Sequence, residues 1–288
     1  MTYKSILVPL EESQSLDSVL STTLLLAQLF NSYIEGLCIR SSLAGAIAVG
    51  FEGGVAALAS TEEQFEKEQD TRIGRLKNHF EQFIINNGLN NDVSSVSDGP
   101  SAKWVESETS GLGLYGQYGR YFDLIVVGRP TPGILAPAMN TLETVLFDTG
   151  RPVLIVPPTA TKSIGENILV AWNGSSETAR AISLATPLMK KAQKITIVSI
   201  EGARVPGPSS DQIAQNLQRH GLNVEVDDIT EKQTPTSAGK IILDKAKESN
   251  ADLLIKGGYT QSRLRQMIFG GTTTHILNES KIPIFMTH

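Results

Sequence analysis

The residues best suited to chemistry in this sequence form a glycine- and arginine-rich segment near the carboxyl terminus. Gly257 and Gly258 follow an apolar run, and Gly270 and Gly271 precede a helix-like run that begins at Thr272. Glycines let a backbone approach a ligand closely, and the free N–H groups that open a helix hold phosphate oxygens well. The residues between the two glycine pairs include no acid, so the segment predicts a phosphate-binding loop.

Two arginines inside this segment fit the same interpretation. Arg263 and Arg265 can add charge-assisted hydrogen bonds to a phosphate. The residues alone leave a second interpretation open, an ordinary strand–loop–helix connection whose arginines are solvated or paired with a neighbouring domain.

Composition and charge limit the class of protein and the kind of ligand. The 288 residues predict about two domains, and 40% hydrophobic with 19% charged residues is typical of a soluble globular protein. Residues 1–162 carry 11 Lys/Arg and 18 Asp/Glu, a net charge of −7, whereas residues 163–288 carry 14 and 12, a net charge of +2, and the two sum to −5. This acidic total argues against nucleic acid as the main partner. An anionic ligand suits the second half better than the first.

Cysteine content and hydropathy predict a cytoplasmic protein that does not interact with membranes. Cys38 is the single cysteine, so no internal disulfide can form, and its apolar surroundings predict a small core residue. The amino terminus lacks the long apolar segment of a signal peptide, and no apolar run approaches membrane-spanning length.

The chain is organised as a duplication, because three apolar segments of the first half recur in the same order in the second. The recurring pairs are 4–10 with 166–172, 122–128 with 251–257, and 151–156 with 282–286. Internal repeats of this kind indicate the overall architecture more directly than any single motif does. We predict a first domain at residues 1–157, a linker rich in Pro and Thr at 158–165, and a second domain at 166–288.

Alternating strand and helix patterns predict the α/β class. In the second half we expect strands near 167–172, 194–200, 222–227, 252–257 and 282–286, and helices near 175–190, 209–220, 236–249 and 271–279. Apolar strands separated by amphipathic helices predict a parallel sheet that is covered on both faces. The prediction is therefore two tandem, doubly wound, Rossmann-like domains with ligands at the carboxyl ends of the strands.

The first half is about 33 residues longer than the second between its first and late strands. The extra residues fall mostly in an Ala/Gly-rich apolar loop at about 41–60 and in the polar helix that follows at about 61–87. This loop either covers a crevice or an interface, or is a partly ordered insertion, and the sequence leaves both open.

No catalytic motif is expected. A formal G-x-G-x-x-G at 111–116 is rejected because residues 102–108 before it have a helix-like pattern and a strand at Leu124 follows, the reverse of the dinucleotide-binding order. The four histidines are scattered without companion ligands at metal spacing, and no G-x-S-x-G elbow occurs.

With this layout and the glycine segment, the chain resembles the universal stress protein family in its tandem two-domain form. The resemblance covers nearly the whole chain and is most specific at 168–175 and from Gly257 through the strand after Pro283. The ATP-binding pattern of the family, G-x2-G-x9-G-(S/T), falls on Gly257, Thr260, Gly270 and Gly271. Two of the four positions depart, because Thr260 replaces a glycine and Gly271 replaces Ser/Thr.

The resemblance implies ATP or another adenine nucleotide as ligand and implies a strand order of 3-2-1-4-5 in each domain. Asn173 stands where ATP-binding members have an Asp near the ribose and metal, so Mg²⁺ binding is expected to be weak or absent. Ile200 corresponds to the strand end on the adenine side. The cofactor-binding residues that we predict are Ala171, Asn173, Ser175, Ile200, Gly257, Thr260, Arg263, Arg265, Gly270, Gly271 and Thr272.

The first half departs further from the nucleotide-binding pattern. Pro130 and Pro132 lack the N–H groups that a phosphate needs, and Met139 and Asn140 replace the closing glycine pair. We therefore expect this half to be a structural partner, paired with the second half through the last strands, 152–156 and 283–286, as an internal pseudo-dimer. Further self-association of the whole chain is a second expectation.

The function implied is that of a cytoplasmic stress-response protein, which binds an adenine nucleotide in its second domain and acts through protein partners without appreciable catalysis. Two alternatives stay open at this point. One is a slow ATPase, for which the sequence offers no metal carboxylate or water-positioning base, and the other is a scaffold protein whose glycine loop binds no nucleotide.

Overall fold

The computed structural model describes residues 2–40, 58–91, 99–107, 113–130, 137–258 and 271–288. The inserted loop of the first half at 41–57 lies outside these ranges, as does most of the glycine- and arginine-rich segment. Within the described ranges, every helix is too short or too polar to cross a lipid bilayer.

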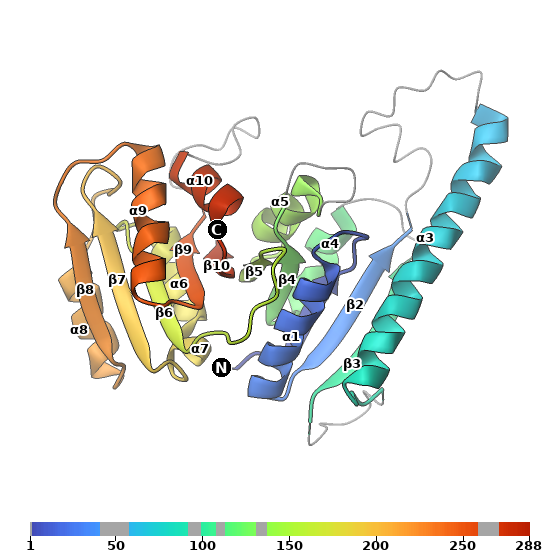
Figure 1. The fold of residues 1–288 in the computed structure, drawn as a ribbon, viewed down its shortest axis with the longest axis horizontal. Helices are drawn as coiled ribbons and strands as arrows, with labels where there is room; N and C mark the ends of the chain where they lie inside the picture. Colours follow the sequence, from blue (N-terminus) through green and yellow to red (C-terminus); the bar gives the residue numbers. More distant parts are fainter. Residues whose placement is uncertain (1, 41–57, 92–98, 108–112, 131–136, 259–270) are drawn as a thin grey trace.

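Each half contains five strands that alternate with helices (Figure 1). The first half consists of β1 (Ser5–Pro9), α1 (Leu16–Phe30), β2 (Tyr33–Ile39), α3 (Leu58–Asn86), β3 (Ser101–Ser107), α4 (Gly113–Tyr118), the 3-10 helix η2 (Gly119–Tyr121), β4 (Leu124–Gly128), α5 (Met139–Asp148) and β5 (Val153–Val156). The second half consists of β6 (Asn167–Ala171), α6 (Ser176–Leu184), α7 (Thr186–Met189), β7 (Lys194–Ile200), α8 (Ser210–Arg219), β8 (Val224–Ile229), α9 (Pro235–Glu248), β9 (Leu253–Gly257), α10 (Gly271–Glu279) and β10 (Ile284–Thr287).

The strands form one ten-stranded sheet in the order β3-β2-β1-β4-β5-β10-β9-β6-β7-β8. Each half is parallel and has the strand order 3-2-1-4-5, which confirms the predicted fold class. The halves meet where β5 and β10 pair antiparallel, with Ile155 opposite Ile284 and Val153 opposite Met286. What would be an unpaired edge strand in each half is therefore covered by the other half.

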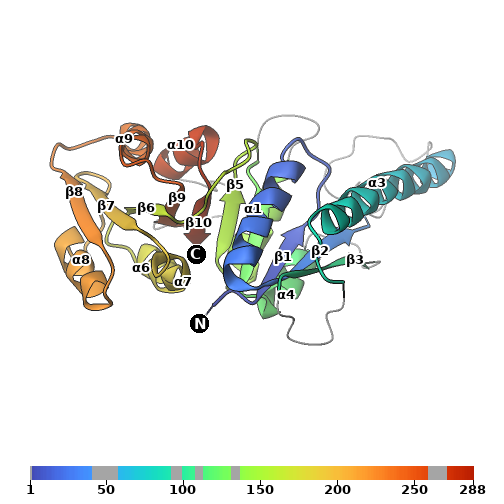
Figure 2. The same ribbon diagram turned by 60° about the horizontal axis from the view of Figure 1, so that its bottom comes forward.

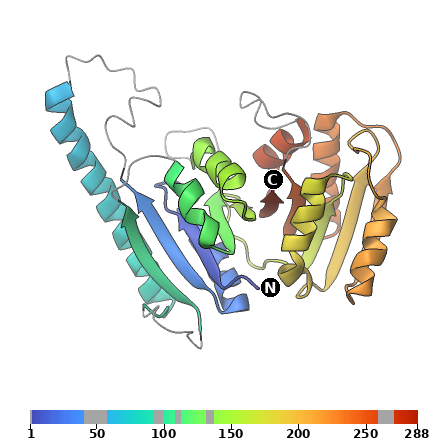
Figure 3. The same ribbon diagram turned by 180° about the vertical axis from the view of Figure 1, so that it is seen from behind.

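Helices cover both faces of the sheet (Figures 1 and 3), and alternate residues of each strand point to the two faces. On β6, Ile168 and Val170 belong to the hydrophobic cluster beneath α1, α3, α6, α7 and α8, whereas Leu169 and Ala171 belong to the cluster beneath α4, α5, α9 and α10. Both clusters contain residues from the two halves. The hydrophobic core therefore continues through the junction between the halves.

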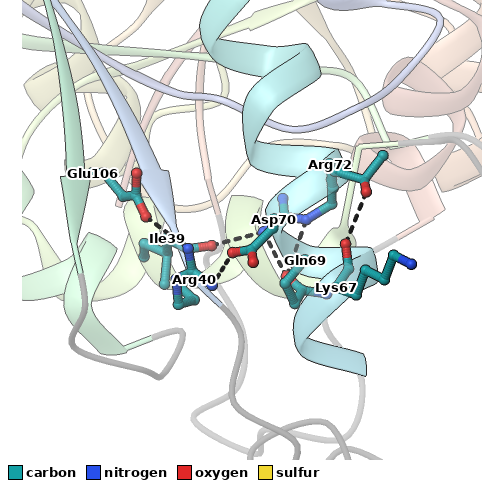
Figure 4. A network of polar contacts seen from close by, with 8 residues as sticks. Ile39, Arg40, Lys67, Gln69, Asp70, Arg72 and Glu106 are labelled. Atoms are coloured by element: carbon teal, nitrogen blue, oxygen red, sulfur yellow. Dashed lines mark hydrogen bonds and ion pairs between the residues drawn. The ribbon is translucent and has the colours of Figure 1, made fainter. Parts of the chain in front are cut away.

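The helix α3 is the largest departure of the first half from the second and runs beyond the end of the sheet (Figure 2). A set of polar contacts fixes it to the carboxyl ends of β2 and β3 (Figure 4). Arg72 donates to the carbonyl oxygen of Ile39 at 2.9 Å, and Arg40 lies between Asp70 of α3 and Glu106 of β3, with N–O distances of 2.7 and 3.3 Å.

Two expected elements differ from the observed ones. The helix expected over 175–190 is interrupted at Ala185, because Pro187 in the next turn has no N–H to donate to the preceding carbonyl. Residues 102–108 were expected to be helical, but Ser101–Ser107 is strand β3, whose seven residues pair in parallel with β2. Tertiary pairing overrides the local pattern there.

This strand removes the reason for rejecting the G-x-G-x-x-G at 111–116, because β3 precedes the motif and helix α4 begins within it, at Gly113. Gly111 and Leu112 lie outside the described residues. Other features still argue against a dinucleotide site, since β3 lies at one edge of the sheet and α4 has only six residues. The dinucleotide-binding motif follows the central first strand and opens a full helix.

Candidate functional site

The carboxyl ends of three neighbouring strands define the candidate site in the second half. The strand β6 pairs in parallel with both β7 and β9, so the ends of the three strands lie at one edge of the sheet. Ala171, Ile200 and Gly257 are their last residues. This edge is where ligands of doubly wound sheets bind.

The predicted residues near β9 meet through a short series of contacts. The Oδ1 atom of Asn173 accepts a hydrogen bond from the hydroxyl of Thr178 at 2.7 Å. Gly257 passes so close to Thr178 that an added Cβ would lie 2.5 Å from its amide nitrogen. Lys256 then connects β9 to α10, because its Nζ atom donates to the carbonyl of Gly257 at 2.7 Å and to the hydroxyl of Thr273 at 2.9 Å.

The first residues of α10 lie against the beginning of α9. The hydroxyl of Thr272 donates to the carbonyl of Pro235 at 2.7 Å, and a Cβ added to Gly271 would lie 3.2 Å from the Cβ of Pro235. Four predicted residues lie outside the described residues: Thr260, Arg263, Arg265 and Gly270.

Asn173 and Ser175 are both engaged in starting helix α6. The amide oxygen of Asn173 also accepts from the backbone N–H of Ser175 at 3.2 Å. Ser175 is the N-cap residue, and its hydroxyl accepts from the N–H of Thr178 at 3.2 Å. A side-chain oxygen at this position satisfies an N–H that the helix itself leaves unpaired. The side chains of both residues therefore have a structural role independent of any ligand.

The structure explains the glycine at position 257 by packing, and this reason differs from the predicted one. The sequence suggests that this glycine lets a ligand approach the backbone. In the structure a Cβ at Gly257 would lie 2.5 Å from the amide nitrogen of Thr178 and 2.8 Å from the carbonyl carbon of Glu177. The absence of a side chain is therefore required for α6 to pack on the end of β9.

Ala171 and Ile200 contribute side chains to the core at this edge. Both are buried and belong to the cluster that includes Ala238 and Ile242 of α9. Only the backbone at these two strand ends is therefore in a position to meet a ligand.

Lys256 is the residue at this edge that the sequence analysis missed. It is 6% exposed and lies on the last part of β9. Burial lowers the pKa of its ammonium group from the ordinary 10.5 to about 7, and among the described residues no carboxylate offsets this effect. The only signal in the sequence is a lysine that interrupts the apolar strand Leu253–Gly257.

The equivalent place in the first half is apolar. By the strand repeat, Val127 of β4 corresponds to Lys256, and Leu142 of α5 corresponds to Thr273. Val127 and Leu142 are both buried in the same hydrophobic cluster. The polar pair of the second half is therefore not a requirement of the fold.

The first half also carries its own negative charge at this edge. Glu11, which corresponds to Asn173 in the repeat, accepts hydrogen bonds from the backbone N–H of Ala138 at 3.3 Å and the hydroxyl of Thr141 at 2.7 Å. Both donors belong to the start of α5, where a helix attracts anions. Burial raises the pKa of Glu11, and the hydrogen bonds from Thr141 and Ala138 oppose this shift.

Arg129 connects the end of β4 to the second half. It is 7% exposed, and its Nη1 atom donates to the carbonyl of Ser280, just after α10, at 2.6 Å. Its Nε atom is buried without a partner among the described residues, and burial lowers the pKa of its guanidinium group. The end of α10 is therefore held by the other half of the chain.

Comparisons with known proteins agree with this architecture. The model of the Universal stress protein family matches residues 165–288. A universal stress protein from Archaeoglobus fulgidus DSM 4304 is 19% identical, with a TM-score of 0.74 and coverage of 99% of this chain and 96% of that chain. A putative universal stress protein from Pseudomonas aeruginosa UCBPP-PA14 is 16% identical, with a TM-score of 0.52 and coverage of 99% and 93%. No curated protein matches the chain.

Proposed function

We propose, on the premise that the second half matches the Universal stress protein family and the whole chain has the fold of a two-domain universal stress protein, that this protein serves the stress response by binding an adenine nucleotide in its second half. The nucleotide phosphates are placed at the start of α10, beside the carboxyl ends of β6 and β9. The protein acts through protein partners and without appreciable turnover, in the cytoplasm.

The contrast between the two equivalent helix starts carries this proposal. The start of α5 is occupied by the carboxylate of Glu11, which accepts from Ala138 and Thr141. At the matching position Asn173 is neutral, and its amide oxygen is turned to Ser175 and Thr178 of α6. Among the described residues, the start of α10 therefore has no counterpart of the carboxylate that occupies the start of α5, and a phosphate can bind there.

The absence of turnover in this proposal rests on the residue types at the strand ends. Asn173 stands where the ATP-binding members that the sequence resembles have an Asp. A neutral amide holds a hard cation less well than a carboxylate does, so the proposed ligand is bound with little help from Mg²⁺. This supports nucleotide binding as a signal rather than as the start of hydrolysis.

Two measurements test the proposal. Mass spectrometry of small molecules released from the purified, denatured protein should detect an adenine nucleotide. Titration calorimetry with ATP, ADP and AMP should then give one binding event per chain. Detection of no nucleotide, together with no heat of binding for any of the three, would leave the scaffold function in its place.

A matched pair of variants tests which half binds. Gly271→Val places a branched side chain at the start of α10 and should abolish binding, because the backbone there must approach the phosphates. Asn140→Val makes the corresponding change in α5, where Asn140 is exposed, and should leave binding unchanged. Full affinity in Gly271→Val, or loss of affinity in Asn140→Val, contradicts a site in the second half.

A further inference from the structure

We propose that Lys256 is a buried counter-charge for an anionic group of the ligand at the start of α10, and that binding there places a proton on Lys256. This inference rests on the proposed function and deepens it. It assigns a residue and a proton to the phosphate end of the site.

The position of Lys256 is the first observation. Its Nζ atom donates to Thr273 in the first turn of α10 and to the carbonyl of Gly257, so the amine lies directly beneath the start of that helix. An ammonium group has three N–H donors, and two of them have partners among the described residues. Among the described residues the third N–H has no partner, and we assign it to an anion bound at the helix start.

The electrostatics of this position are the second observation. The start of a helix carries a partial positive charge, and a lysine next to it adds a full one. Charges that are taken out of water normally have a partner of opposite sign. Burial alone accounts for the lowered pKa of Lys256, so no described acid supplies this partner. The neighbouring elements carry other titratable groups, but none of them contributes to the pKa shift of Lys256. These groups are Lys240 and Asp244 of α9, His275 and Glu279 of α10, Glu143 of α5, Glu177 of α6 and His288.

The comparison between halves is the third observation. Val127 and Leu142 show that two apolar side chains fill the same place in the same fold. Lysine and threonine at Lys256 and Thr273 therefore cost stability that an apolar pair does not. A bound anion removes this cost by pairing with the ammonium group, and it raises the pKa of Lys256 above its value in the empty protein.

This rise in the pKa of Lys256 on binding implies that the protein takes up a proton. Above pH 7 the amine of the empty protein is largely neutral, given its pKa of about 7. Binding of a phosphate favours the charged form, so one proton moves from solvent to Nζ as the ligand enters. The ligand class is defined by this chemistry as a multiply charged phosphate, and pyrophosphate serves as a probe that lacks the nucleoside.

Calorimetry on the full chain tests the inference. Wild type, Lys256→Met and the first-half control Val127→Met are titrated with ATP and with sodium pyrophosphate at pH 8, in two buffers of different ionisation enthalpy. Wild type should take up close to one proton per ligand. Lys256→Met should bind about 10- to 100-fold more weakly and take up none, because a hydrogen bond to a charged group is lost. Val127→Met should match wild type. Thr273→Val retains the amine and should keep the proton uptake with a smaller loss of affinity.

The outcomes separate this inference from the proposed function. Equal affinity and equal proton uptake in wild type and Lys256→Met would overturn the role of Lys256 and leave nucleotide binding intact. Binding of pyrophosphate with uptake that depends on Lys256, but no binding of ATP, would support the inference and overturn the adenine nucleotide. Binding of neither probe by wild type would overturn both.

Discussion

Replacing Lys256 with methionine should stabilise the ligand-free protein by an amount that depends on pH. Burial lowers the pKa of this amine from 10.5 to about 7, a difference of about 3.5 pH units. One pH unit corresponds to about 1.4 kcal/mol, so carrying the charge inside the fold costs on the order of 5 kcal/mol. Methionine has a similar length and no charge, and it adapts well to an irregular apolar space.

The sign of the pH dependence follows from where the proton is held. Between pH 7 and about 10.5 the unfolded chain keeps a proton on Lys256 that the folded chain has released. Stability therefore rises with pH through this window in wild type, by about 1.4 kcal/mol per unit, and this contribution is missing in the variant. The advantage of Lys256→Met should be largest below pH 7 and should shrink by about 3 kcal/mol between pH 6 and pH 9.

Urea unfolding at pH 6, 7, 8 and 9 measures this difference. Protein that has been unfolded, freed of ligand and refolded is used, because a bound anion would raise the pKa again. Lys240→Met, on the exposed surface of α9, is the control and should follow wild type at every pH. A constant difference between wild type and Lys256→Met across the four pH values would refute the reasoning. Such a constant difference would be explained by lost hydrogen bonds and changed packing, because these effects change stability equally at each pH.

Three further results are expected. Gly257→Ala should destabilise the protein by about 2 kcal/mol or more in urea unfolding, because its Cβ would lie 2.5 Å from the amide nitrogen of Thr178. Its control, Gly74→Ala on α3, has nothing within 4 Å of the added Cβ and should stabilise by about 0.5–1 kcal/mol; equal effects would contradict the packing argument. Glu11→Ala should lower stability by about 1–3 kcal/mol through the unpaired N–H at the start of α5, with nucleotide affinity unchanged in calorimetry. Incubation with radiolabelled ATP should release no phosphate above the blank, with or without Mg²⁺, and steady release by pure protein would favour the ATPase.

Much of the fold is predictable because the duplicated strands are apolar and β-branched. The strand at Lys194–Ile200 and the helix at Gly271–Glu279 match their predicted ranges, and the remaining strands of the second half start or end within two residues of theirs. The strand β3 is different because its polar residues, such as Lys103 and Glu106, give it a helix-like pattern. It is an edge strand, so it lacks the continuous burial that reveals an inner strand.

The candidate site is predictable only in part, because its critical contacts join distant residues. Glu11 and Ala138 are 127 positions apart, and nothing local in the sequence indicates that the carboxylate of Glu11 caps the start of α5 at Ala138. The role of Gly257 depends on the path of α6, and a glycine at a strand end suggests ligand approach equally well. Lys256 is visible in the sequence as a lysine in an apolar strand, but its significance depends on knowing that no acid among the described residues offsets the effect of burial on its pKa.

The antiparallel junction of β5 with β10 has a consequence for how such a protein can evolve. In a dimer of two identical chains, every substitution appears twice, once on each side of the symmetry axis. Here the two copies are joined by a chain segment, so dilution does not separate them and each can mutate alone. A homodimer could not contain different residues at equivalent positions, as this chain does at Glu11 and Asn173 and at Val127 and Lys256. The fusion therefore allows the carboxyl ends of the strands to carry different side chains in the two copies.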